Sequence, residues 1–119
     1  MSSTARSRVL VETVGGVTVA SFADSELTAD QVIEEVGEQL NGLADNLGLT
    51  KVLLNFREVR FMSSSMLAVL LKFSRKVTAA QGQLKLCSIA PNLKEIFKIT
   101  RFDRIFEIYD EESVALDSF

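Results

Sequence analysis

Two short segments rich in hydrophobic residues open the chain on either side of a glycine pair. They span residues 9–14 and 17–22, and Gly15-Gly16 separates them. A two-residue glycine loop between two such segments is typical of a β-hairpin. The pattern therefore predicts an antiparallel pair of strands, and the polar residues 1–8 before it are expected to form a flexible start.

The next hydrophobic pattern has helical spacing. Residues 23–27 are expected to be a connection, and Thr28 and Gln31 match a capping box, in which each side chain bonds the backbone N–H of the other residue. The helix is expected to end near Gly48. Its apolar residues fall within roughly a third of a helical wheel and should pack on a sheet. They are Val32, Ile33, Val36, Leu40, Leu43 and Leu47.

The centre of the chain combines a strand, a loop and a second helix. Residues 51–56 contain an unbroken apolar run, as expected of a strand that is covered on both faces. A loop over residues 57–62 leads to a helix that starts with three serines, and residues 84–89 give the next strand. Strand, helix and strand form a βαβ unit, so the two strands should be parallel and the crossover right-handed. The apolar stripe of this helix consists of Met66, Val69, Leu70, Phe73 and Val77.

The last part of the chain predicts two more helices and a strand. Pro91 suits the first turn of a helix, where a missing N–H costs no hydrogen bond. Residues 99–104 are expected to be a turn and residues 105–109 a short strand. Asp110 is expected to cap a final helix that has Glu111 in its first turn, near the positive end of the helix dipole.

These elements predict one domain over residues 1–119 with an α/β fold. It should contain a mixed, mostly parallel β-sheet of roughly four to five strands with about four covering helices. A hydrophobic fraction of 47% with 24% charged residues is that of a globular protein rather than a disordered one. No apolar run is long enough to span a membrane, and no secretory signal follows the first residues.

Composition excludes most enzyme chemistry. The chain has no histidine, which removes a Ser-His-Asp triad and any histidine-containing metal site. Cys87 is the sole cysteine, so thiolate zinc sites and internal disulfides are also excluded, and a small core residue in a reducing cytoplasm is expected. The net charge of −3 argues against a general nucleic-acid binder. We expect no enzymatic activity, no cofactor and no metal.

Three consecutive serines, Ser63, Ser64 and Ser65, stand where the second helix begins. One of them is expected to be the N-cap, a role worth about 1 kcal/mol. The remaining hydroxyls lie at a helix N-terminus, where free N–H groups and the helix dipole favour anions. A phosphate added there brings about two negative charges and should leave the fold intact while changing what can bind.

This stretch resembles the signature of the STAS domain, a family that contains the anti-sigma factor antagonists and the cytoplasmic domains of sulfate transporters. The usual pattern is a hydrophobic strand, then Phe-x-Asp-Ser-Ser/Thr-Gly-Leu, then an apolar helix. The likeness covers nearly the whole chain. It is carried by residues 51–56, 59–71, 82–86, 89–97 and 102–109.

In the antagonist branch, the serine after the motif's aspartate is phosphorylated by an anti-sigma factor that is also a kinase. By position the resemblance implies Ser64 as the acceptor, with Ser63 and Ser65 as the next candidates. Here Ser63 replaces the aspartate and Met66 replaces the glycine. The residues expected to contact the partner are Arg57, Arg60, Met62, Ser63, Ser64, Ser65 and Met66.

Several of these residues have a second interpretation. Met66 is either a packed core residue or an adaptable partner contact. Arg57 and Arg60 are either solvated charges or ligands for an acidic partner or a phosphate. A second basic cluster is expected to be a solvated helix face rather than a binding site. It consists of Lys94, Lys98, Arg101 and Arg104.

The leading hypothesis is a phospho-switchable, cytoplasmic protein-binding module that sequesters an anti-sigma factor with serine kinase activity. A serine phosphatase would reset it, and the protein is expected to be a monomer or weak dimer that binds no nucleic acid. Two alternatives are a scaffold subunit of a larger sensory complex that is not switched, and a STAS domain that senses a small ligand. A serine hydrolase is disfavoured because the chain has no histidine and no Gly-x-Ser-x-Gly elbow.

Overall fold

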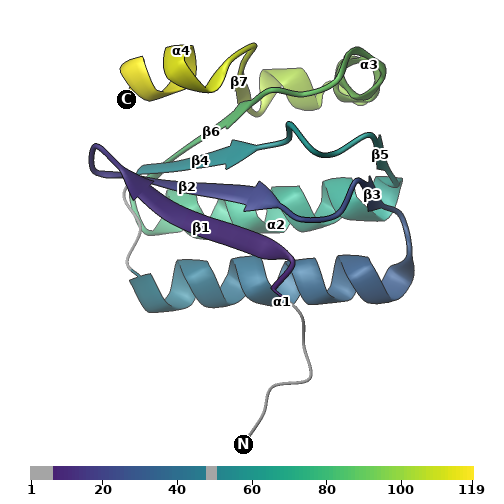
Figure 1. Cartoon of the computed structure of the whole chain (residues 1–119), viewed down its shortest axis with the longest axis horizontal. Coiled ribbons are helices and arrows are strands. Elements are labelled where there is room, and N and C mark those ends of the chain that lie inside the picture. Colours follow the sequence, from purple (N-terminus) through teal and green to yellow (C-terminus); the bar gives the residue numbers. More distant parts are fainter. Residues whose placement is uncertain (1–6, 48–50) are drawn as a thin grey trace, which may run out of the picture.

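A five-stranded sheet with the strand order β1-β2-β4-β6-β7 forms the centre of the molecule (Figure 1). The computed structural model describes residues 7–47 and 51–119. The strands of this sheet are β1 (Val9–Val14), β2 (Val17–Phe22), β4 (Lys51–Asn55), β6 (Gln83–Cys87) and β7 (Glu107–Tyr109). The helices are α1 (Asp30–Leu47), α2 (Ser64–Ala79), α3 (Pro91–Ile99) and α4 (Glu112–Asp117), with a 3-10 turn at Phe102–Arg104.

The opening hairpin is confirmed with the predicted bounds. β1 and β2 are antiparallel, and Val14 pairs with Val17 across the loop. Gly15 and Gly16 have φ angles of 55° and 83°, which glycine adopts at no steric cost. The glycine pair therefore sets the register of the whole hairpin.

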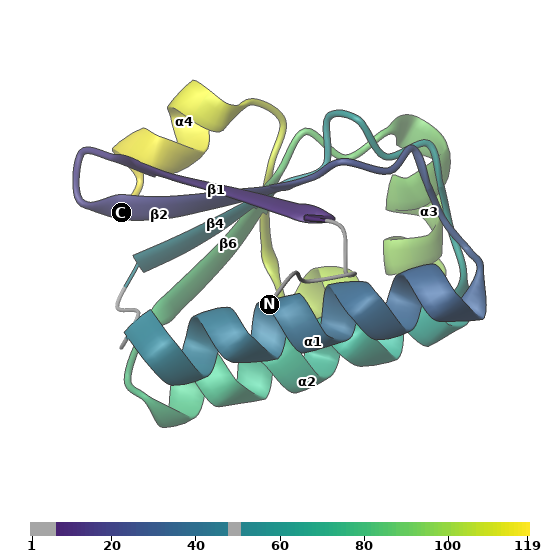
Figure 2. The ribbon, with the colours of Figure 1, turned by 60° about the horizontal axis from the view of Figure 1, so that its bottom comes forward.

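The rest of the sheet is parallel, as the sequence predicts. β2 pairs with β4, β4 with β6, and β6 with β7, all in parallel. Each connection moves one position along the sheet in the same direction, so right-handed crossovers place α1 and α2 on the same face. Figure 2 shows these two helices side by side under the sheet, with α4 on the opposite face.

Burial explains why the central strands lack alternation. Val52, Leu53 and Leu54 of β4 are all fully buried, because helices cover both faces of this strand. Leu54 belongs to the larger core under α1 and α2, whereas Leu53 packs with Val19, Cys87 and the short α4. The interpretation of Cys87 as a core residue is confirmed.

A second, two-stranded sheet was not predicted. It pairs β3 (Glu26–Leu27) with β5 (Phe61–Met62) in parallel, within segments that the hydrophobic pattern predicts to be connections. Two residues are too few to show the period of a strand, so no hydrophobic pattern identifies them. This pair brings the residues before α1 alongside the residues before α2.

The predicted caps of two helices are wrong. The capping box of Thr28 and Gln31 does not form at the start of α1. The helix begins at Asp30, and the carbonyl of Ala29 accepts its first hydrogen bond. The Gln31 side chain donates to Glu35 rather than back to Thr28. The N-cap of α4 is Glu111, because the Asp110 carboxylate instead binds Lys94.

The last strand is shorter than the predicted 105–109, since Ile105 belongs to the preceding turn and is half exposed. The predicted end of the first helix near Gly48 lies outside the described residues, as does most of the start that is expected to be flexible. Arg8, within that start, is fixed to the fold by two ion pairs.

Candidate functional site

The serine turn follows β4 through a loop that the backbone holds closely. The side-chain oxygen of Asn55 accepts from the N–H of Arg57 at 2.8 Å, and its amide donates to Glu112 at 2.6 Å. The N–H of Phe56 donates to the carbonyl of Cys87, at the end of the neighbouring strand. Asn55 is buried, so these bonds satisfy its polar atoms and fix the direction in which the chain leaves the sheet.

Two other segments contact the residues at the serine turn. The carbonyl of Ser25 accepts from the N–H groups of both Arg60 and Phe61, at 2.7 and 3.1 Å. The Asn92 side chain of α3 donates to the carbonyl of Arg60 at 3.0 Å. The N–H of Ser63 donates to the carbonyl of Leu27 at 3.0 Å. The start of α2 is thereby held by β3 on one side and by α3 on the other.

The three serines differ in environment. Ser63 is the N-cap, with an extended backbone (φ −87°, ψ 167°), but its side chain makes no capping hydrogen bond. Its Oγ is buried and, among the described residues, has no hydrogen-bond partner. Ser64 and Ser65, the first two residues of α2, are both exposed. Sequence position predicts the cap, and only the structure separates one enclosed hydroxyl from two accessible ones.

The two methionines of the predicted site are inside the protein. Met66 is fully buried and Met62 is 7% exposed, and both belong to the larger core. Of the two interpretations of Met66, the packed core residue is the one that the structure shows. A partner can therefore reach neither side chain directly without a rearrangement.

The accessible surface around the serines contains a residue that sequence reasoning missed. Phe61 is 54% exposed, directly before the serine turn. Arg57 and Arg60 are also exposed, and Arg57 makes a long, solvent-exposed ion pair of 3.7 Å with Glu58. An exposed phenylalanine close in sequence to two exposed arginines and two exposed serines is typical of a protein-binding surface. We call Arg57, Arg60, Phe61, Ser64 and Ser65 the serine surface.

The second basic cluster is divided by an ion pair. Lys94 binds the carboxylate of Asp110 and lowers the pKa of Asp110 below its ordinary value of 3.8. Lys98, Arg101 and Arg104 are exposed. A hollow of about 430 Å³ lies beside this cluster, between α3 and β7. It does not extend to the serine surface.

Residues 7–47 and 51–119 contain neither a candidate metal cluster nor a candidate membrane-spanning helix. No group of three or more histidine, cysteine, aspartate or glutamate side chains in that part could hold a metal ion. Within the same residues, no helix has both the length and the apolar character that crossing a membrane requires.

Most of the chain matches a known family. The sequence profile of the STAS domain matches residues 8–115. The Bordetella bronchiseptica protein named "Putative anti-sigma factor antagonist BtrV" is 25% identical over 114 residues, which cover 94% of each chain.

Solved structures show the same fold. An anti-sigma-factor antagonist (STAS) domain protein from Planctomyces limnophilus has a TM-score of 0.82 at 25% identity, over 92% of this chain and 95% of that one. The Bacillus cell fate determinant SpoIIAA in its phosphorylated form has a TM-score of 0.69 at 21% identity, over 92% and 97%. With the profile match over nearly its whole length, the chain belongs to the STAS domain family.

Proposed function

We propose that this protein is an anti-sigma factor antagonist that is switched by phosphorylation of Ser64. In the unphosphorylated state the serine surface binds an anti-sigma factor with serine kinase activity and keeps it from its sigma factor. Phosphorylation of Ser64 by that kinase ends the interaction, and a serine phosphatase restores it. This function places the protein in the bacterial cytoplasm, where sigma factors act.

One observation carries the proposal: the exposed hydroxyl of Ser64 lies at the start of a rigidly held helix. A kinase needs an accessible hydroxyl, which Ser64 and Ser65 offer and the enclosed Oγ of Ser63 does not. The first turn of α2 contains no acidic residue, so an added phosphate meets free N–H groups and the positive end of the dipole. The helix can therefore accept the phosphate without unfolding.

The surroundings of Ser64 support the proposed loss of partner binding after phosphorylation. Phe61 gives a partner an apolar contact, and Arg60 gives it a cation beside the hydroxyls. A phosphate of about two negative charges would alter the electrostatics of this surface and obstruct an apolar contact next to it. Met62, Met66 and Ser63 contribute by holding the shape of the turn, since all three have their side-chain tips enclosed.

The test combines phosphorylation with binding. The protein is incubated with ATP and each small ATP-binding anti-sigma factor of its source organism, and its intact mass is measured. We expect one phosphate on wild type and on Ser65→Ala, and none on Ser64→Ala. A protein that binds such a kinase but never gains a phosphate is an unswitched scaffold, and the proposal is then wrong.

A phosphomimetic variant tests the consequence for binding. Ser64→Asp should weaken binding of the anti-sigma factor at least tenfold, measured by calorimetry, while the melting temperature changes by no more than about 2 °C. Ser65→Asp is the matched control, one residue along the same turn. A large loss of stability in Ser64→Asp would show that the hydroxyl is mainly structural.

A further inference from the structure

The two edges of the central sheet are protected unequally. At one edge, β7 is three residues long and is packed against α4. At the other edge, β1 is six residues long and pairs only with β2 among the described residues. Figure 1 shows β1 as the outermost strand. Long edge strands are normally protected from further pairing by a proline, by charged side chains such as lysine, or by a bulge. β1, Val-Leu-Val-Glu-Thr-Val, has the single charge of Glu12 and neither a proline, a lysine nor a bulge.

The register of the hairpin determines which backbone groups of β1 point outward. The N–H of Ala23 donates to the carbonyl of Arg8, so Arg8 and, by alternation, Leu10, Glu12 and Val14 bond to β2. The N–H and carbonyl groups of Val9, Val11 and Thr13 therefore point away from β2. The side-chain oxygen of Gln39 on α1 accepts from the N–H of Val9 at 2.9 Å and from the N–H of Arg8 at 2.8 Å, so the N–H of Val9 is already bonded.

The side chains of this edge are apolar on both faces of the sheet. Val11 is 47% exposed on the face that carries α1, beyond the buried Val9, and Leu10 is 50% exposed on the opposite face. An added strand would have to present apolar residues on both of its faces to cover them. β1 of another copy does so, because it carries the same two residues.

We propose that β1 is an interface at which two copies of this chain pair antiparallel about a two-fold axis, which joins their sheets into one. The register places Val11 opposite Val11 of the other copy and Thr13 opposite Val9. It forms four backbone hydrogen bonds: two between the Val11 residues, and two from the N–H of Thr13 to the carbonyl of Val9.

The neighbouring registers are less favourable. Shifting the pairing toward the start of the strand requires the N–H of Val9, which Gln39 already occupies. Shifting it toward the hairpin loop places Glu12 directly opposite Glu12, and like charges in that position are destabilising. A shift by a single residue moves side chains to the wrong face.

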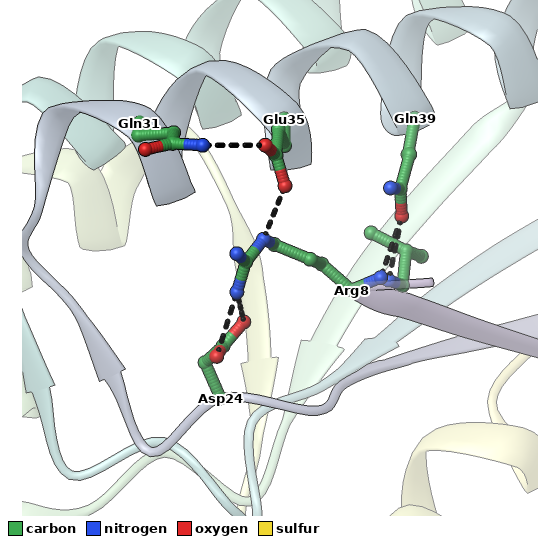
Figure 3. Close-up of polar contacts among 6 residues, drawn as sticks. Arg8, Asp24, Gln31, Glu35 and Gln39 are labelled. Atoms are coloured by element: carbon green, nitrogen blue, oxygen red, sulfur yellow. Dashed lines mark hydrogen bonds and ion pairs between the residues drawn. The ribbon is translucent and has the colours of Figure 1, made fainter. Parts of the chain in front are cut away.

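The charges on α1 do not oppose this arrangement. Glu35 of α1 is paired with Arg8 at 2.6 Å. Glu34 and Glu38 line the groove between α1 and α2, away from the β1 edge. Arg8 in Figure 3 thus holds the start of β1 against α1 and pairs with both Asp24 and Glu35, the acidic residues of this cluster.

Crosslinking tests the register in the full-length protein carrying Cys87→Ala. Val11→Cys places two thiols within about 5.5 Å between Cα atoms, within disulfide range, so mild oxidation should give a covalent dimer. Thr13→Cys is the matched control on the same strand and face. Four residues of offset keep its thiols about 14 Å apart, and it should form no covalent dimer. Equal crosslinking of both variants, or none with Val11→Cys, would overturn the proposal.

Charge exchange tests the interface without a covalent bond. We expect wild type to have a dimer mass by light scattering at about 100 μM, and Val11→Lys to weaken dimerisation at least tenfold, because it places two lysines opposite each other. An equimolar mixture of Val11→Lys and Val11→Glu should form the mixed dimer in native mass spectrometry. Monomeric wild type, or no mixed dimer, would contradict the interface.

Discussion

Ser63 and Ser64 are adjacent and chemically identical, yet the fold gives them different roles. The Ser63 hydroxyl is enclosed without a partner, whereas the Ser64 hydroxyl is open to solvent. The resemblance to the STAS motif points to Ser64 by position, and exposure is compatible with Ser64 and Ser65 alike. Burial of one hydroxyl leaves Ser64 and Ser65 as the accessible acceptors.

Ser63→Ala should change the free energy of unfolding by no more than about 0.5 kcal/mol. A serine that caps a helix with its side chain contributes about 1 kcal/mol, but Ser63 makes no such bond, and its alanine variant loses a buried hydroxyl that has no partner. Urea unfolding measures the difference. A loss of 1 kcal/mol or more would show that the hydroxyl does cap α2 in solution.

The buried thiol of Cys87 should make the free energy of unfolding depend on pH. Burial raises the pKa of its thiol above the ordinary value of 9.0, the hydrogen bond with Ser88 acts in the opposite direction, and nearby Glu112 raises it further. The unfolded chain therefore ionises first, so this contribution to stability is complete below pH 9.0 and falls as the pH rises from there toward the folded-state pKa.

A comparison of two proteins isolates that effect. Between about pH 8 and about pH 10, wild type should lose more unfolding free energy than Cys87→Ala, because only wild type carries the thiol. The two proteins are otherwise identical, so every other contribution cancels in the difference. Parallel pH profiles would show that the thiol has the same pKa in the folded and unfolded chains.

At the scale of elements, the short helix α4 is held in place by a side chain of the sheet. α4 has six residues, too few to be stable alone, and packs on the sheet face opposite α1 and α2. Lys85 of β6 is buried beneath it and donates at 2.8 Å to both the carbonyl and the hydroxyl of Ser118. The ring of Phe119 lies 4.7 Å from the same ammonium group. One lysine thus connects the end of the chain to the sheet.

Lys85→Ala should lower the free energy of unfolding by about 2–3 kcal/mol, because it removes a buried, fully bonded side chain. Hydrogen exchange should rise most in α4, measured by mass spectrometry on peptides. Lys72→Ala, an exposed lysine on α2, is the control and should leave both quantities nearly unchanged. Unchanged exchange in α4 would mean that Lys85 does not hold it.

At the scale of the whole molecule, two cores share one sheet. The larger core lies between the sheet and the helices α1, α2 and α3, and contacts between aromatic rings extend through it. Phe56 lies 4.9 Å from Phe22 and 6.5 Å from Phe97, between ring centroids. The smaller core uses the other side of the same central strands, so neither core can lose its sheet without exposing the other.

Unfolding should therefore be a single cooperative transition, as predicted for one domain. Far-UV circular dichroism reports mainly α1 and α2, whereas the fluorescence of the sole tyrosine, Tyr109, reports the side of the sheet covered by α4. Both probes should give the same urea midpoint. Separate midpoints would show that the smaller core unfolds on its own.

The sequence by itself determined the elements whose pattern is long enough to be read: the hairpin with its glycine loop, the apolar stripes of α1 and α2, and the buried central strand. Their order and right-handed crossovers then fixed a mostly parallel sheet. The serine triplet also identified where function should be sought, because a motif is a local property of the chain.

Tertiary structure alone decided the features that depend on distant residues. β3 and β5 exist only because they pair with each other, and the paired residues Glu26 and Phe61 are 35 positions apart in the sequence. The packing of distant residues decides which side chains of the serine turn are buried: Met66 is buried, Phe61 is exposed and the Ser63 hydroxyl is enclosed. The local pattern of hydrophobic residues in the sequence does not contain this information. Asp110 does not cap α4 for the same reason, because its carboxylate binds Lys94, a residue of α3.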